Sequence, residues 1–116
     1  MQFNSKTYKL DSSTANSATY RGPGQTLSIR DQLQLSRQRI KTSAAYSGTS
    51  RGNATLTRTV PLTGALTPTG VASLSVDPAL PVGMADADQD ALIADFRGFV
   101  ASSEFATWVK SRTFIF

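Results

Sequence analysis

The sequence predicts an α+β protein in which an antiparallel sheet is followed by two helices. Two observations carry this prediction. Apolar and polar residues alternate along several stretches before residue 77, which is typical of strands, and the spacing becomes helical after Gly83. A chain of 116 residues is long enough for one domain with one modest core. We expect a single domain over residues 1–116, with an N-terminal hairpin and turn at 1–24, a sheet at 25–77 and a helix pair at 84–113.

The N-terminal stretch is polar, with isolated apolar residues. Tyr8 and Leu10 flank Lys9, a pattern that indicates a short hairpin or an edge strand. The segment Arg21-Gly22-Pro23-Gly24 predicts a turn, because proline fixes φ and glycine accepts positive φ. It lacks the Lys-Ser/Thr pair and the following helix of a phosphate-binding P-loop.

A second strand is expected at residues 26–31, where Leu27 and Ile29 alternate with Ser28 and Arg30. We expect a break near residues 31–34 before the chain enters the central hairpin.

The central hairpin is expected over residues 35–60, with a Gly-, Ser- and Asn-rich turn at 47–53. In its second arm Leu56 and Val60 point to one face, and three threonines point to the other. In its first arm the more polar face carries Arg39, Lys41, Ser43 and Ala45, opposite Ile40, Thr42, Ala44 and Tyr46. Arg58 falls on the apolar side, so we expect it near the exposed edge of its strand.

The segment 61–70 contains two prolines and two glycines and is expected to be a rigid loop suited to contacts. A strand over 71–77 should follow and end at Asp77-Pro78.

From residue 86 onward, apolar residues recur at helical spacing, and Ser102 or Ser103 can cap a second helix. The apolar faces of these two helices need a surface to cover. They are formed by Leu92, Ile93, Phe96, Phe99, Val100, Phe105, Trp108 and Val109.

Charge is distributed unevenly along the chain. Residues 1–76 carry nine Lys/Arg and two acids, whereas residues 77–116 carry three Lys/Arg and six acids. A basic sheet beside an acidic helical part favours a polyanionic partner, although a basic balance alone is weak support.

Several function classes are excluded or disfavoured by composition. Cysteine and histidine are both absent, which excludes a Ser-His-Asp triad, a Cys-His pair and the usual zinc sites. The spacing Asp86-x-Asp88-x-Asp90 imitates a calcium loop, but Ala91 and Arg97 occupy the positions of its glycine and final glutamate. Acids at a helix N-terminus explain this pattern better.

We expect no enzyme and no cofactor. The absence of a signal-like stretch or a long apolar run predicts a soluble, cytoplasmic protein without a membrane partner.

The candidate site is the polar face of the sheet. Cations bind phosphate, and hydroxyls on a rigid sheet can bind exposed bases, so RNA is the expected ligand. The face has almost no aromatic residue, which argues against a base-stacking platform. Simple solvent exposure is the plain alternative for such a face. The candidate RNA-binding residues are Ser28, Arg30, Arg39, Lys41, Ser43, Asn53, Thr55, Thr57, Thr59, Ser73 and Ser75. Because two short helices would leave sheet edges open, we also expect a dimer.

The order of these elements resembles the coat proteins of single-stranded RNA bacteriophages (levivirus-like). The resemblance lies in the stretch LSRQRIKTS from residue 35, the strand ATLTRTVP from residue 54, VASLSV from residue 71, and ADQDALIADFRGFVASSEFATWV before an aromatic C-terminus. It implies an N-terminal hairpin, a five-stranded antiparallel sheet and two C-terminal helices in an interlocked homodimer. It also implies an icosahedral shell with RNA on its interior sheet face.

The resemblance further implies that one RNA hairpin is bound to repress translation, with a maturation protein as another partner and assembly in the bacterial host cytoplasm into a virion. Ser43, Thr55 and Thr57 match hairpin-binding positions, although Thr57 stands where the family often has lysine, and Val71 or Ser73 stands for a stacking tyrosine. The expected dimer interface is Leu92, Phe96, Phe99, Val100, Phe105, Trp108 and Val109, and the expected inter-dimer loop residues are Pro61, Leu62, Leu66 and Pro68. Two alternatives stay open: a dimeric RNA-binding regulator that forms no particle, and an enzyme subunit or scaffold without RNA affinity.

Overall fold

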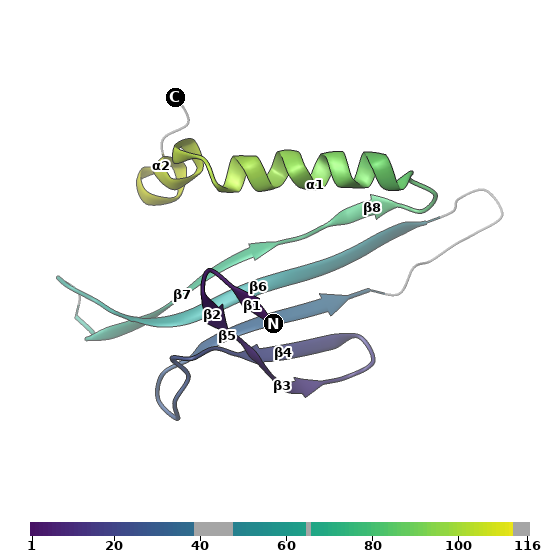
Figure 1. The fold of residues 1–116 in the computed structure, drawn as a ribbon. Helices are drawn as coiled ribbons and strands as arrows, with labels where there is room; N and C mark the ends of the chain where they lie inside the picture. The colour runs from purple at the N-terminus through teal and green to yellow at the C-terminus, as the bar shows by residue number, and fades with distance from the viewer. Residues whose placement is uncertain (39–47, 65, 113–116) are drawn as a thin grey trace. The chain divides into compact units, whose positions relative to one another are not determined.

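The structure, a computed structural model, describes residues 1–38, 48–64 and 66–112. Two compact units make up the chain, Met1–Val82 and Gly83–Phe116. The first holds all the described strands and the second holds both described helices (Figure 1). The α+β order expected from the sequence is confirmed, while a single domain over residues 1–116 stays a prediction.

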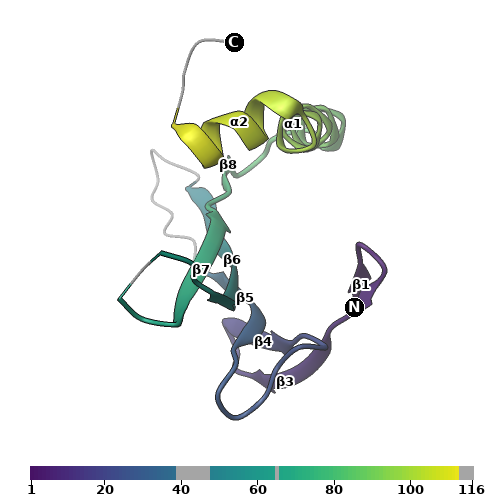
Figure 2. The same cartoon turned by 90° about the vertical axis from the view of Figure 1, so that its left-hand side faces the viewer.

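Antiparallel pairing connects every neighbouring strand of the main sheet, in the order β3-β4-β5-β6-β7. A short strand, β8, pairs with the start of β6, and a separate two-stranded ribbon, β1–β2, precedes the sheet (Figure 2). The strands are β1 Gln2–Phe3, β2 Lys6–Thr7, β3 Lys9–Ser13, β4 Ser17–Arg21, β5 Asp31–Arg37, β6 Thr49–Pro61, β7 Thr69–Val76 and β8 Ala79–Pro81. The hairpin β3–β4 is therefore part of the sheet, which begins earlier than the expected residue 25.

The strand expected at residues 26–31 was wrong, since this segment is the loop between β4 and β5. Thr26 forms two hydrogen bonds with Ile29 within this loop. Its amide donates to the Ile29 carbonyl at 2.8 Å, and its hydroxyl accepts from the Ile29 amide at 3.0 Å. These local bonds compete with strand pairing, and Leu27 is left fully exposed.

The turn expected at residues 47–53 was also wrong for its described part. β6 already begins at Thr49, and its first three residues pair with β8. Gly52 lies opposite Arg37 in β5, and a Cβ atom there would come within 2.8 Å of the Ser36 carbonyl oxygen. The glycine thus permits close approach of two strands instead of a turn. The first arm of the hairpin lies at Asp31–Arg37, and the arm expected around residues 39–46 falls outside the described residues.

The expected strand end at Asp77-Pro78 is confirmed, because β7 ends at Val76. The chain then resumes beside β6 as β8, and the Gly52 amide donates to the Pro78 carbonyl at 3.1 Å. The loop between β6 and β7 is shorter than expected. Pro61 and Thr69 are still paired, and the Leu62 amide donates to the Pro68 carbonyl at 2.8 Å.

One face of the sheet is apolar. Directly opposed residues in neighbouring strands share a face, so the register assigns its members. They include Leu10, Tyr20, Leu33, Leu35, Leu56, Leu74 and Val76. Among the described hydrophobic residues only Tyr8 is buried in the single chain, at 1% exposure, while Leu74 remains 55% exposed.

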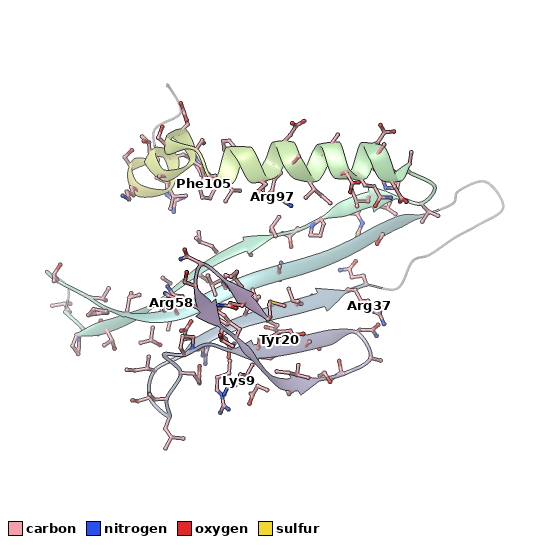
Figure 3. All side chains as sticks on the ribbon, viewed as in Figure 1. Lys9, Tyr20, Arg37, Arg58, Arg97 and Phe105 are labelled. Atoms are coloured by element: carbon pink, nitrogen blue, oxygen red, sulfur yellow. The ribbon has the colours of Figure 1, made fainter. Side chains whose placement is uncertain are left out.

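Arg58 lies on this apolar face, but β6 is paired on both sides there, with Asp31 in β5 and Ala72 in β7. The expected edge position was therefore wrong. Instead, the positive charge of Arg58 is compensated by Asp31 and Tyr8. Arg58 Nε lies 3.3 Å from Asp31 Oδ1, and Arg58 Nη2 donates to the Tyr8 hydroxyl at 3.1 Å. The pKa of Arg58 is raised, chiefly by the hydrogen bond with Tyr8 and also by Asp31, against the opposing effect of desolvation. Figure 3 shows Arg58 beside the N-terminal ribbon.

The helical unit contains α1 Asp86–Val100 and α2 Ser103–Ser111. Asp86 and Asp88 lie in the first turn of α1, as expected for acids near the positive end of a helix dipole. Ser102 caps α2, because its side chain accepts a hydrogen bond from the Phe105 amide at 3.3 Å. Both positions agree with the sequence prediction.

Candidate nucleic-acid interface

The second face of the sheet is polar over all five strands of the main path. Thr55 lies between Gln34 in β5 and Ser75 in β7, and the next row places Thr57 between Gln32 and Ser73. Hydroxyl and amide groups therefore form a continuous surface, which we call the polar face. Its polar members are Lys9, Ser12, Ser17, Thr19, Arg21, Gln32, Gln34, Ser36, Asn53, Thr55, Thr57, Thr59, Ser73 and Ser75. An apolar residue, Val71, also lies on this face, opposite Thr59.

Cations occupy one corner of the polar face. Lys9 in β3 is directly opposite Arg21 in β4, and Arg21 is opposite Gln32 in β5. Lys9 projects from the sheet in Figure 3, at the edge formed by β3. A pair of exposed cations beside rows of hydroxyl and amide groups suits a ligand with phosphates and hydrogen-bonding bases.

The structure brings six of the predicted RNA-binding residues together on this face. They are Asn53, Thr55, Thr57, Thr59, Ser73 and Ser75. Ser28 and Arg30 do not lie on a strand, because they belong to the loop between β4 and β5. Arg39, Lys41 and Ser43 lie outside the described residues.

Arg30 nevertheless reaches the same region through its backbone. Its amide donates to the Thr59 hydroxyl at 3.0 Å, and its carbonyl accepts from the Thr59 amide at 2.7 Å. Ser28, Arg30 and Thr59 line an open hollow of about 390 Å³ together with residues 25–27, Ile29 and 69–71. The hollow lies where the β4–β5 loop meets the adjoining ends of β6 and β7.

The opposite end of the polar face contains an acidic group. The Asn53 side-chain amide donates to Asp77 Oδ1, and the Thr55 hydroxyl donates to Asn53 Oδ1 at 2.6 Å. Asn53 comes directly before Ala54 and Asp77 directly after Val76, and Ala54 and Val76 are paired in antiparallel strands, so Asn53 and Asp77 are cross-strand neighbours. This chain of hydrogen bonds gives the two RNA-binding candidates a fixed orientation.

Sequence reasoning missed the contributions of β4 and β5 to the polar face. Gln32, Gln34 and Ser36 alternate with Leu33 and Leu35, which is a clear strand pattern. The break expected near residues 31–34 was wrong, because β5 begins at Asp31 and runs through these positions. The Lys9–Arg21 pair depends on the register of β3 and β4, which local sequence does not specify.

A second candidate surface lies in the helical unit. Four aromatic rings follow one another, with centroid distances of 6.4 Å for Phe96–Phe99, 5.5 Å for Phe99–Phe105 and 6.2 Å for Phe105–Trp108. No residue of α1 or α2 is buried in the single chain, and Phe96 and Leu92 are 48% and 49% exposed. Val100, Trp108 and Val109 continue these apolar faces. Of the predicted loop residues, Leu66 is fully exposed and Leu62 is 38% exposed.

A metal-binding cluster is absent from the described part of the chain. No group of three or more Asp and Glu residues there is placed to hold a metal ion. Across residues 1–38, 48–64 and 66–112, the one ion pair is that between Asp31 and Arg58. No described helix is both long and apolar enough to cross a membrane.

Comparison with solved structures identifies the architecture. A subunit of the virus-like particle of Beihai levi-like virus 32 superposes with a TM-score of 0.82 at 13% identity, covering 97% of this chain and 91% of that chain. The virus-like particle of bacteriophage AVE019 gives a TM-score of 0.75 at 16% identity, covering 96% and 89%. The chain has the levi-like phage coat-protein fold. The coat protein of bacteriophage EMS014 is also similar, with a TM-score of 0.61 at 21% identity over 84% of this chain and 68% of that one.

The fold is shared without close sequence similarity. No protein-family model matches the sequence, and no curated protein matches it. The expected antiparallel sheet followed by two C-terminal helices is confirmed as the fold of these coat proteins. The roles of individual residues in RNA binding and in subunit contacts stay predictions.

Proposed function

We propose that this chain is a capsid protein that assembles as homodimers into an icosahedral shell around single-stranded RNA. One observation carries the proposal: proteins that share this fold over 97% and 96% of the chain are described as virus-like particles. The virion is then its location, and assembly occurs in the cytoplasm of a bacterial host.

The homodimer is supported by the apolar surfaces of both units. Tyr8 is the one described hydrophobic residue that is buried in the single chain, and Leu10, Leu74, Phe96 and Phe99 are between 46% and 58% exposed. Soluble monomers rarely expose contiguous apolar patches of more than a few hundred Å². A second copy would cover these residues with an interface of about 2,000 Å² or more, in the range of obligate dimers. The proposed interface consists of Leu92, Phe96, Phe99, Val100, Phe105, Trp108 and Val109.

RNA binding is supported by the composition of the polar face. Lys9 and Arg21 provide phosphate contacts, and the hydroxyl and amide rows offer hydrogen bonds to unpaired bases. In the proposed shell this face lines the interior. Binding of one RNA hairpin to the same face would repress translation, and a maturation protein would be a further partner of the shell.

Contacts between dimers are assigned to the exposed loop between β6 and β7. Leu62 and Leu66 offer apolar side chains at its surface, and the 2.8 Å bond from the Leu62 amide to the Pro68 carbonyl closes its base. A closed loop base limits the entropy lost when the loop is fixed in a contact.

Electron microscopy of the purified recombinant protein tests this function, together with extraction of nuclease-protected nucleic acid from the same fraction. The proposal predicts uniform round particles that contain protected RNA. Dimers that bind RNA in several salt concentrations but never form particles would instead support the dimeric regulator. Dimers without RNA affinity would show that the polar face is ordinary solvated surface.

A further inference from the structure

Arg58 has hydrogen-bond donors that its own chain does not use. A guanidinium carries five N–H donors and no acceptor. Nε donates to Asp31 Oδ1 and Nη2 donates to the Tyr8 hydroxyl, and the side chain forms no other hydrogen bond with the described residues. The Arg58 side chain is still 39% exposed, whereas that of Asp31 is 7% exposed. Arg58 therefore presents N–H groups of a cation at the surface of the sheet.

These N–H groups lie on the face that the proposed homodimer covers. Leu56 and Val60 flank Arg58 along β6 and share its face. Ala72 is directly opposite Arg58 in β7, and Leu74 in the next row is 55% exposed. A second copy that covers these apolar side chains also removes water from Arg58. Donors of a buried charge are unfavourable when they lack a partner, so the covering surface has to supply an acceptor.

The helical unit contains one carboxylate that suits this requirement. Asp95 lies about one helical turn after Leu92 and one turn before Phe99, so it borders the apolar face of α1. It is exposed, and it forms no hydrogen bond or ion pair within the described part of the chain. The basic sheet part and the acidic helical part are also complementary in net charge.

The other acids of the helical unit are placed differently. Asp86 and Asp88 lie in the first turn of α1, where the positive end of the helix dipole stabilises them. Asp90 lies outside the apolar face, and Glu104 in α2 accepts a hydrogen bond from the Ser103 hydroxyl at 3.3 Å. Asp95 is thus the acid that an apolar contact through α1 would bury without a partner.

We propose that Arg58 of one subunit forms an ion pair with Asp95 of the partner subunit, and that this pair determines how the helices of each subunit align on the sheet of the other. The inference rests on the proposed homodimer and adds a charged contact to its apolar interface. A two-fold symmetric dimer contains this contact twice, because each subunit provides one Arg58 and one Asp95. Misaligned helices would leave both charges buried without a partner, so the pair adds specificity to the interface.

Charge exchange tests the pair directly. Arg58→Glu and Asp95→Arg each place like charges at both contacts of a homodimer, whereas a mixed dimer of the two variants has opposite charges at both contacts. The two variants are mixed in equal amounts, and native mass spectrometry measures homodimers and mixed dimers. We expect mixed dimers to exceed either homodimer by about tenfold or more, whereas random mixing gives roughly twofold.

A double-mutant cycle keeps the test valid if Arg58→Glu does not fold. Asp95→Asn leaves Arg58 without its counter-charge in the interface and should raise the dissociation constant of the dimer by about tenfold to hundredfold per contact. In a protein that already carries Arg58→Gln, the same substitution should change this constant by less than about threefold. Asp90→Asn is the matched control and should have no effect in either protein. Sedimentation velocity over a dilution series measures all four dissociation constants.

The outcomes separate the ion pair from the homodimer itself. Random mixing of the charge-exchanged variants would overturn the pair while the dimer stands, and so would equal effects of Asp95→Asn and Asp90→Asn. An effect of Asp95→Asn that persists in the protein with Arg58→Gln would assign Asp95 to another partner and also overturn the inference. An unmodified protein that stays monomeric at all concentrations would overturn the proposed homodimer, and the inference with it.

Discussion

Asp31 and Arg58 face each other across β5 and β6, with 3.3 Å between Oδ1 and Nε, on the otherwise apolar face of the sheet. Asp31 is 5% exposed, and its carboxylate also accepts from the Tyr8 hydroxyl at 3.4 Å and the Gly24 amide at 3.2 Å. Tyr8 stacks on Phe3 with a centroid distance of 4.5 Å. The pair thus connects the N-terminal ribbon, the β4–β5 loop and the sheet.

Replacing Asp31 by Asn should lower the free energy of unfolding by about 1–3 kcal/mol, because the substitution leaves Arg58 without its counter-charge and weakens the bond to Gly24. Tyr8→Phe removes only hydrogen bonds and should cost about 1 kcal/mol. Urea unfolding at fixed protein concentration measures both. Equal stability of Asp31→Asn and the unmodified protein would show that the cluster is not a structural anchor.

Gly22→Ala should also destabilise the protein. A Cβ atom at this position would come within 2.6 Å of Asp31 Cγ and 2.8 Å of Tyr8 Cε1, so the buried cluster would have to shift. Gly98→Ala is the matched control. Gly98 lies in α1 with nothing within 4 Å of its added Cβ, and alanine favours a helix by about 1 kcal/mol. Thermal denaturation should show a lower Tm for the first variant and an equal or higher Tm for the second.

Trp108→Asp should abolish the soluble dimer, because a charge in the aromatic row cannot be buried without compensation. Asp90→Ser is the control, since it changes an exposed residue of α1 away from the apolar stripe. Sedimentation velocity separates the forms. A folded, stable monomer of Trp108→Asp would contradict the interlocked dimer, and aggregation or loss of expression would agree with it.

Neutralising Lys9 and Arg21 to Ser should reduce the RNA packaged per particle. In the RNA-binding equilibrium of the dimer, the same two substitutions should also make the plot of the logarithm of the binding constant against the logarithm of the salt concentration less steep, by about 1–2 per chain. The double variant Arg97→Ser and Lys110→Ser removes the same charge from the helical unit and should leave the slope unchanged. The double variant Arg39→Ser and Lys41→Ser tests whether the two cations that the sequence predicted to bind RNA contribute to RNA packaging. Unchanged RNA content in the Lys9 and Arg21 variant would show that phosphate is bound elsewhere.

The sequence predicted one half of the polar face well. Thr55, Thr57, Ser73 and Ser75 alternate with apolar residues, and a period of two determines which side chains share a face. The same rule was misleading at residues 26–31, where alternation is present but Thr26 and Thr59 bind the backbone of a loop instead.

The remaining features depend on contacts between residues far apart in the chain. Asp31 resembled a strand break because its partner Arg58 is 27 positions away, and no local pattern reveals the pair. Gly52 resembled a turn residue for the same reason: its role is to let β5 and β6 approach closely. The helices, whose periodicity and cap are local, were predicted with few errors.

Cryo-electron microscopy of particles assembled from the unmodified protein would show directly which face of the sheet binds RNA. We expect a closed shell of dimers in which RNA density lies against Thr55, Thr57, Ser73 and Ser75 on the interior. A shell with these residues on its outer surface, or with RNA density against another face, would contradict it. So would a preparation that forms only dimers under all assembly conditions.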